Sequence, residues 1–141
     1  MKKNDIKILL VDDEADILEI VGYNLSSEGY QVTTAKNGVE AIEKAKKYKP
    51  QLIILDVMMP EMDGIEACEK LRGIPDLSNT IITFLTARGE DYSQVAGFDA
   101  GADDYITKPI KPKVLVSKVK ALLRRLKESD NPLDTIIKVG A

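Results

Sequence analysis

The sequence contains no histidine, no tryptophan and a single cysteine among its 141 residues. Without histidine, the chain lacks the commonest general base, proton shuttle and transition-metal ligand of proteins. A lone cysteine, Cys68, excludes a disulfide within the chain and fits a reducing compartment. Any chemistry must therefore depend on carboxylates, lysine, hydroxyl groups and a hard metal ion.

The sequence also lacks a marked charge excess and a long apolar run. Its 23 acidic and 20 basic residues leave a net charge of −3, without the basic footprint that nucleic-acid binding usually leaves. The apolar runs are far shorter than the roughly 20 residues needed to cross a bilayer, and the N-terminus does not resemble a signal peptide. We therefore expect one cytoplasmic globular domain, for which a hydrophobic content of 44% supplies a core.

Short apolar segments with the composition of strands recur along the chain. They occupy residues 8–11, 31–35, 52–55, 81–85 and 104–107. Three of them are apolar almost throughout, which is typical of parallel strands buried on both faces.

Segments with helical periodicity separate these strands. Gly29 and Gly73 follow the ends of the first and third, Asn37 is placed to cap the second, and Phe98 belongs to a short fourth. The apolar positions of the second are Val39, Ile42 and Ala45, and those of the long fifth are Leu115, Val119, Leu122 and Leu126. Five strands alternating with five helices predict an α/β three-layer sandwich around a doubly wound parallel sheet.

Polar residues follow four of the five predicted strands. They are Asp12, Asp13 and Glu14 after the first, Asp56 after the third, Thr86 after the fourth and Lys108 after the fifth. In a doubly wound sheet, ligands bind outside the carboxyl ends of the strands, so these side chains should converge at one edge. Taken singly, most of them have a structural explanation: Asp13 or Glu14, for example, could simply cap a helix. Asp56 is harder to explain in this way, because burial of a carboxylate after an apolar strand is costly without a partner.

Clustered carboxylates repel one another unless a cation lies between them. Lys108 can offset one charge, and the remainder favours Mg²⁺, which binds one or two carboxylates together with phosphate oxygens. Asp56 can attack phosphorus without a general base, while Lys108 and Thr86 would hold the phosphoryl oxygens. The strand ends therefore indicate phosphoryl transfer to Asp56.

Four stretches of the chain closely resemble the receiver domains of two-component response regulators. They are LLVDDE at 9–14, DVMMPEMDG at 56–64, LTAR at 85–88 and GADDYITKP at 101–109. The resemblance covers about residues 5–127 and implies a flavodoxin-like sheet with strand order 2-1-3-4-5. Residues 128–141 are expected to form a linker and possible stub of a missing output domain, the alternative being a disordered native tail.

The resemblance also implies roles for individual residues. Asp56 matches the phosphoacceptor, and its phosphoryl donor would be a phosphohistidine on a partner histidine kinase. Asp12 and Asp13 match the acidic pair that holds Mg²⁺, together with Asp56 and the backbone carbonyl of Met58.

Three further positions match the family's phosphate-binding and switching residues. Lys108 matches the phosphate-binding lysine, and its bond to Pro109 is expected to be cis. Thr86 matches a hydroxyl that moves onto the phosphoryl group, and Tyr105 matches a ring that then turns inward.

Finer features resemble regulators whose output is a winged-helix DNA-binding domain. Their phosphorylated receivers form homodimers through the fourth helix, fifth strand and fifth helix. The charged residues expected on this face are Asp99 with Lys120 and Asp104 with Lys118. A third ion pair of the family is replaced here by Gln94 and Val114, which predicts a weaker or less strictly specified dimer.

Three other functions stay open at this point. A phosphatase of the haloacid-dehalogenase type would need a second aspartate two residues after its nucleophile, where this chain has Met58. A flavodoxin-like FMN-binding protein would need hydroxyls and backbone N–H groups after the first strand rather than acids. A stand-alone receiver that relays phosphate or docks on a partner keeps the family and changes the output. We expect a signalling protein rather than an enzyme.

Overall fold

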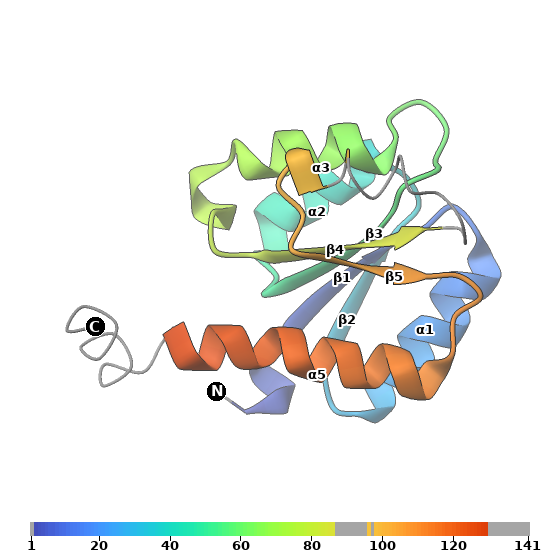
Figure 1. Ribbon diagram of the computed structural model, residues 1–141, viewed down its shortest axis with the longest axis vertical. Coiled ribbons are helices and arrows are strands. Elements are labelled where there is room, and N and C mark those ends of the chain that lie inside the picture. Colours follow the sequence, from blue (N-terminus) through green and yellow to red (C-terminus); the bar gives the residue numbers. More distant parts are fainter. Residues whose placement is uncertain (1, 87–95, 97, 130–141) are drawn as a thin grey trace.

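A five-stranded parallel sheet forms the middle of the molecule. The computed structural model describes residues 2–86, 96 and 98–129. The strands are β1 (Lys7–Val11), β2 (Gln31–Ala35), β3 (Leu52–Asp56), β4 (Ile81–Thr86) and β5 (Asp104–Thr107). They are all parallel in the order β2-β1-β3-β4-β5 (Figure 1), which confirms the predicted flavodoxin-like sheet.

Helices cover both faces of this sheet. They are α1 (Ala15–Ser27), α2 (Gly38–Tyr48), α3 (Gly64–Arg72) and α5 (Pro112–Ser129), with short 3-10 turns at Lys3–Asp5 and Pro75–Leu77. In Figure 1, α2 and α3 lie on one side and α1 and α5 on the other, which gives the predicted three layers. Most of the predicted fourth helix lies outside the described residues, although Phe98 and Asp99 are helical.

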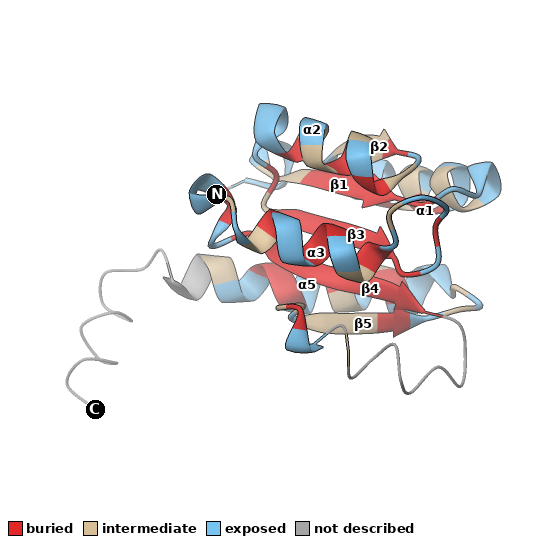
Figure 2. Cartoon of the chain, turned by 90° about the horizontal axis from the view of Figure 1, so that it is seen from above, coloured by how far each residue is buried: buried red, intermediate tan, exposed pale blue. Residues whose placement is uncertain are grey.

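The alternation of side chains along each strand fills two separate cores. Leu9 and Val11 of β1 point into the core beneath α2 and α3. Ile8 and Leu10 point into the core beneath α1 and α5. Every residue of β3 and β4 is buried, whereas β5 at the sheet edge is half-exposed (Figure 2).

The ends of the helices follow the capping residues in the sequence. The Asn37 side chain accepts a hydrogen bond from the Glu40 amide at 2.8 Å, which confirms it as the cap of α2. Gly73 follows α3 as predicted. The prediction for Val39 is wrong in part, because this side chain is 47% exposed while Ala41 and Ala45 carry the buried face of α2.

Arg72, the last residue of α3, fastens the segment that leads into β5. Its guanidinium donates to the carbonyls of Gly101 (2.8 Å) and Thr80 (2.6 Å). It also pairs with the carboxylate of Asp103 at 2.8 Å. Gly101 has a φ of +106°, and a Cβ there would lie 2.8 Å from Arg72 Cγ, so the segment approaches the arginine too closely for a side chain.

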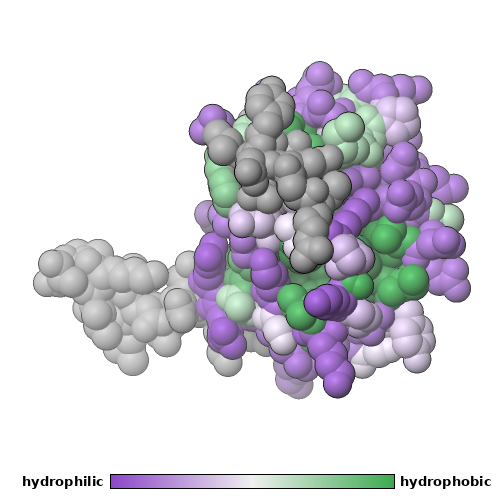
Figure 3. Space-filling view, turned by 45° about the vertical axis from the view of Figure 1, so that its right-hand side comes forward, coloured by the Kyte–Doolittle hydropathy of each residue, from purple (hydrophilic) through white to green (hydrophobic). Residues whose placement is uncertain are grey.

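The face shown in Figure 3 is mostly hydrophilic, with small hydrophobic patches between the charged side chains. No described helix is both long enough and apolar enough to cross a membrane.

Candidate functional site

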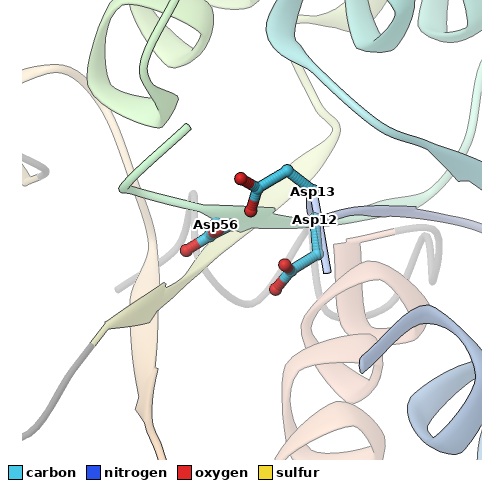
Figure 4. A group of neighbouring side chains, drawn as sticks. All are labelled: Asp12, Asp13 and Asp56. Atoms are coloured by element: carbon cyan, nitrogen blue, oxygen red, sulfur yellow. The ribbon is translucent and has the colours of Figure 1, made fainter. Parts of the chain in front are cut away.

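Three aspartates gather at the carboxyl ends of β1 and β3. Asp12 follows β1 and Asp56 is the last residue of β3, so the pairing of these neighbouring strands brings them together. Carboxylate oxygens of Asp12, Asp13 and Asp56 all lie within 4.8 Å of one another (Figure 4). Asp12 and Asp56 are buried, and Asp13 is exposed. The edge of the sheet therefore holds an acidic cluster with one solvent-facing side.

Lys108 is the cation that reaches this cluster from the end of β5. Its Nζ lies 3.4 Å from Asp12 Oδ2 and 3.5 Å from Asp56 Oδ1. A hydrogen bond from the Lys108 amide to the Thr86 carbonyl (2.7 Å) holds its backbone against β4. The peptide bond to Pro109 is cis, as the family resemblance implied. Burial lowers the pKa of Lys108, but the charges of Asp56, Asp12 and Glu14 outweigh it and raise that pKa, so the ammonium remains charged.

One ammonium does not neutralise two buried acids. Burial and the neighbouring charge of Asp12 raise the pKa of Asp56 to about 7, against the opposing effects of Lys108 and the Met58 amide. Burial also raises the pKa of Asp12, although its Oδ1 accepts a hydrogen bond from the Glu14 amide at 2.9 Å. The site is short of positive charge, as an oxygen-lined cation site would be before the ion binds.

The other oxygen of Asp12 makes the same point by geometry. Asp12 Oδ2 is buried and has no hydrogen-bond partner among the described residues. Lys108 Nζ, at 3.4 Å, forms an ion pair with it without the geometry of a hydrogen bond. A buried carboxylate oxygen without a donor is costly, and a metal ion bound between the aspartates would satisfy it.

The loop after Asp56 turns back closely against its own strand. The Gly64 amide donates to the Val57 carbonyl at 2.9 Å, and a Cβ on Gly64 would lie 2.2 Å from the Asp56 carbonyl oxygen. Only glycine fits there. Asp63 caps α3 through the Glu66 amide, so the Asp-Gly pair both ends the loop and starts the helix. This close approach was not predicted from the sequence, although the Asp63-Gly64 pair is the local signal that indicates a tight turn there.

The predicted switching residues lie on β4 and β5. Thr86 Oγ1 is buried and lacks a hydrogen-bond partner within the described part of the chain. The half-buried Tyr105 ring meets Phe98 edge-on, with the ring centroids 5.8 Å apart. Lys118 Nζ donates to the Tyr105 carbonyl at 2.9 Å and lies 5.4 Å from the centroid of its ring. Register pairs Thr86 with Thr107, so Tyr105 lies two residues before that partner.

The two lysines predicted for the dimer face lie on different flanks of α5. Lys118 faces β5 through its bond to Tyr105, beside Asp104. Lys120 pairs instead with Glu28 beyond the end of α1, at 3.3 Å. Two residues along an α-helix rotate the side chain by about 200°. The structure therefore groups Asp104 with Lys118 and separates Lys120 from them.

Comparisons with known proteins agree with this geometry. The family model described as "Response regulator receiver domain" matches residues 8–120. The alkaline phosphatase synthesis transcriptional regulatory protein PhoP of Bacillus subtilis is 50% identical over 119 residues, which cover 84% of this chain and 49% of PhoP. The transcriptional regulatory protein ResD of the same organism is 48% identical over 126 residues, covering 89% and 51%. The chain thus spans about half the length of the curated relatives it matches.

Solved structures extend the same likeness. The chemotaxis protein CheY4 of Vibrio cholerae superposes with a TM-score of 0.80 at 34% identity, over 83% of this chain and 98% of CheY4. A CheY-like receiver domain protein of Methanospirillum hungatei superposes with a TM-score of 0.82 at 31% identity, over 88% and 98%. With this sheet order and this acidic edge, the chain belongs to the receiver domain family of two-component response regulators.

Proposed function

We propose that Asp56 accepts a phosphoryl group in a Mg²⁺-dependent reaction with the phosphohistidine of a partner kinase. The observation that carries this proposal is the setting of Asp56: a buried carboxylate with its pKa raised to about 7, beside Asp12 and 3.5 Å from an ammonium. Two buried acids beside one cation leave uncompensated negative charge, which is costly unless a further cation binds. Strongly shifted pKa values of this kind cluster at functional sites.

Asp12, Asp13, Asp56 and the backbone carbonyl of Met58 would hold the metal. Asp12 Oδ2, which has no hydrogen-bond donor among the described residues, and the exposed Asp13 suit an oxygen-coordinated ion that keeps some of its water. When bound, Mg²⁺ offsets the negative charge that the acids and the phosphoryl oxygens would otherwise bring together.

The chain's own residues supply the rest of the transfer. A carboxylate oxygen of Asp56 forms a bond to phosphorus while the bond from phosphorus to the donor's imidazole nitrogen breaks. The ammonium of Lys108 would hold one phosphoryl oxygen, and the Thr86 hydroxyl, which has no partner among the described residues, would donate to another. Met58 offers no acid or base for turnover of other phosphate esters, so the chain acts as an acceptor rather than as a phosphatase.

The state of Asp56 would be transmitted to the face formed by β5 and α5. Asp104 and Lys118 lie on this face and would pair across a homodimer of phosphorylated receivers. Asp99 and Lys120 can form the second predicted pair only if Lys120 exchanges Glu28 for the partner's Asp99.

We assign residues 5–127 to the receiver and 128–141 to a linker and possible stub of an output domain. The transcriptional regulators PhoP and ResD share 50% and 48% identity with this chain over regions that make up 49% and 51% of their own lengths. Control of transcription would then depend on a DNA-binding domain outside this chain, in a cytoplasmic regulator.

Intact mass after incubation with acetyl phosphate and Mg²⁺ tests the proposal. We expect the wild-type chain to gain the mass of one phosphoryl group, and Asp56→Asn to gain none. Asp76→Asn is the matched control, because Asp76 is an exposed acid paired with Lys49 far from the site. An equal mass gain in wild type and Asp56→Asn, or a gain that persists in EDTA, would contradict the proposal.

A further inference from the structure

Gly38, the first residue of α2, leaves room for a side chain from a distant loop. A Cβ built on Gly38 would lie 2.9 Å from both Cγ and Sδ of Met62, and 3.1 Å from its Cβ. Real Cβ atoms essentially never approach a neighbour within 3.0 Å. Met62 therefore occupies the space that any side chain at position 38 would need.

The backbone of Gly38 does not itself require glycine. Among the described glycines, positive φ angles occur at Gly29 and Gly101, and Gly38 has none. The start of α2 is already capped by Asn37, and alanine would favour the helix more than glycine does. The requirement for glycine at this position is therefore one of space.

Met62 belongs to the loop of residues 57–63 that joins Asp56 to α3. Val57 and Met59 of this loop are buried, and Met62 packs against the same core beneath α2 and α3. Met58, between the first two, is 65% exposed. Met62 is thus the last apolar anchor before Gly64 closes the loop onto Val57.

We infer that Gly38 is a positioning residue for the metal-dependent phosphorylation of Asp56. The space it leaves lets Met62 dock against α2, and this contact fixes the loop that carries the Met58 carbonyl. The inference rests on the proposed function, in which that carbonyl would help to hold the metal. It adds a residue of α2, a helix that contributes no group to the acidic cluster.

Gly38 and Gly64 restrict the same loop in different ways. A Cβ on Gly64 would meet the backbone of Asp56, which must then move. A Cβ on Gly38 would meet Cγ and Sδ of a flexible methionine, which can rotate away, and Met62 Cβ at 3.1 Å, which would have to shift slightly. Gly38→Ala should therefore fold while losing the anchor.

Magnesium titration of Gly38→Ala tests the inference. We would measure Mg²⁺ binding by calorimetry without a phosphoryl donor, and the Mg²⁺ concentration that gives half-maximal initial phosphorylation by acetyl phosphate. Substitutions of groups that orient a metal's ligands commonly lower metal affinity by about 10–100-fold. Because the contact between Gly38 and Met62 acts one step further from the metal, we expect a smaller rise of about three- to tenfold in both values. Gly22→Ala is the matched control, because nothing lies within 4 Å of a Cβ at that helical glycine and its Mg²⁺ dependence should not change.

Met62→Ala tests the same contact without adding an atom. It should raise the Mg²⁺ requirement by a similar factor, and adding Gly38→Ala to it should raise the requirement little further, because both changes remove one contact. A folded Gly38→Ala protein with the wild-type Mg²⁺ dependence would overturn the inference, as would effects of the two changes that multiply. Failure of the wild-type chain to take up a phosphoryl group would instead overturn the proposed function, while the binding titration still reports on the loop.

Discussion

The acidic edge of the sheet and the face formed by β5 and α5 differ in how deeply their functional side chains are buried. Asp12 and Asp56 end strands that are buried along their length, and their carboxylates are buried as well. Tyr105 and Lys118 lie on a half-exposed edge strand and a helix flank, and hold each other by one hydrogen bond and a cation–π contact.

Electrostatic interactions are therefore strong in the first region, whereas the contacts of the second region can be rearranged more easily. Burial, together with the neighbouring charge of Asp12, raises the pKa of Asp56 at the acidic edge to about 7. Contacts on the wet face are individually weak and can be exchanged for those of a partner at little cost. If the two regions are coupled, we therefore expect a change of charge at the acidic edge to alter the contacts of the second region rather than the fold of the first.

Removing the ammonium from the acidic edge should have the largest effect. Lys108→Met leaves two buried acids without their cation and removes a donor to the phosphoryl oxygens, so we expect initial phosphorylation at saturating Mg²⁺ to fall roughly a hundredfold. Phosphorylation kinetics by mass spectrometry measure it. Lys111→Met, an exposed neighbour, is the control, and a wild-type rate in Lys108→Met would show that the edge does not use this charge.

The acidic edge should also make stability depend on pH when Mg²⁺ is absent. The pKa of Asp56 is about 7 in the folded chain against an ordinary value of 3.8, so the folded state retains a proton that the unfolded state has lost between these values. The free energy of unfolding should therefore fall as pH rises from about 4 to 7, by on the order of 4 kcal/mol, and then level off.

Urea denaturation at several pH values measures this slope. Asp56→Asn should flatten it, and Mg²⁺ should stabilise the wild-type chain more at pH 8 than at pH 5 because protonated carboxyls bind the ion poorly. A wild-type slope that persists in Asp56→Asn would assign the effect to another group.

Arg72 tests whether the two regions can be loosened separately. Arg72→Met removes the bonds to Gly101, Thr80 and Asp103 and should lower the free energy of unfolding by about 2 kcal/mol. Hydrogen exchange should accelerate most at the amides of Ile82 and Asp103, with Mg²⁺ affinity unchanged. Arg124→Met, at an exposed position of α5, is the control. A loss of Mg²⁺ affinity in Arg72→Met would mean that the acidic edge and the segment leading into β5 are coupled and cannot be loosened separately.

The smallest effect is expected at the exposed face. Lys118→Met should weaken dimerisation of the phosphorylated chain by about three- to tenfold and leave its phosphorylation rate unchanged, since a single rim charge contributes about 1 kcal/mol. Lys120→Met should weaken it less, because Lys120 lies beside α1. Sedimentation velocity of the two phosphorylated variants shows which flank of α5 contributes more to dimerisation. An equal loss of dimer affinity in both variants would indicate that the flank beside α1 also takes part in the dimer contact.

Much of the fold and the site could be predicted because local pattern and topology agree. Apolar runs gave the strands, and the rule that parallel strands end at one edge brought Asp12, Asp56 and Lys108 together before any distance was known. The placement of Val39 on the buried face failed because helical periodicity does not tell whether the core covers the first turn of α2, where Val39 lies. The predicted dimer pairs were assigned without the rotation of α5, which sends Lys118 and Lys120 to different neighbours.

The sequence by itself determined the residue types available for chemistry and the positions along the chain of the strands that carry them. With no histidine and with acids at the strand ends, the sequence favoured phosphoryl transfer to a carboxylate. Only the tertiary structure decided how strongly each charged group is perturbed by its surroundings and which glycines are required. The pKa of Asp56 depends on its burial among segments that are far apart in the sequence. Glycine is needed at positions 38 and 64 because Met62 and the Asp56 carbonyl occupy the space that a side chain would take there. Burial and close approach are properties of the packed chain, and no local pattern contains them.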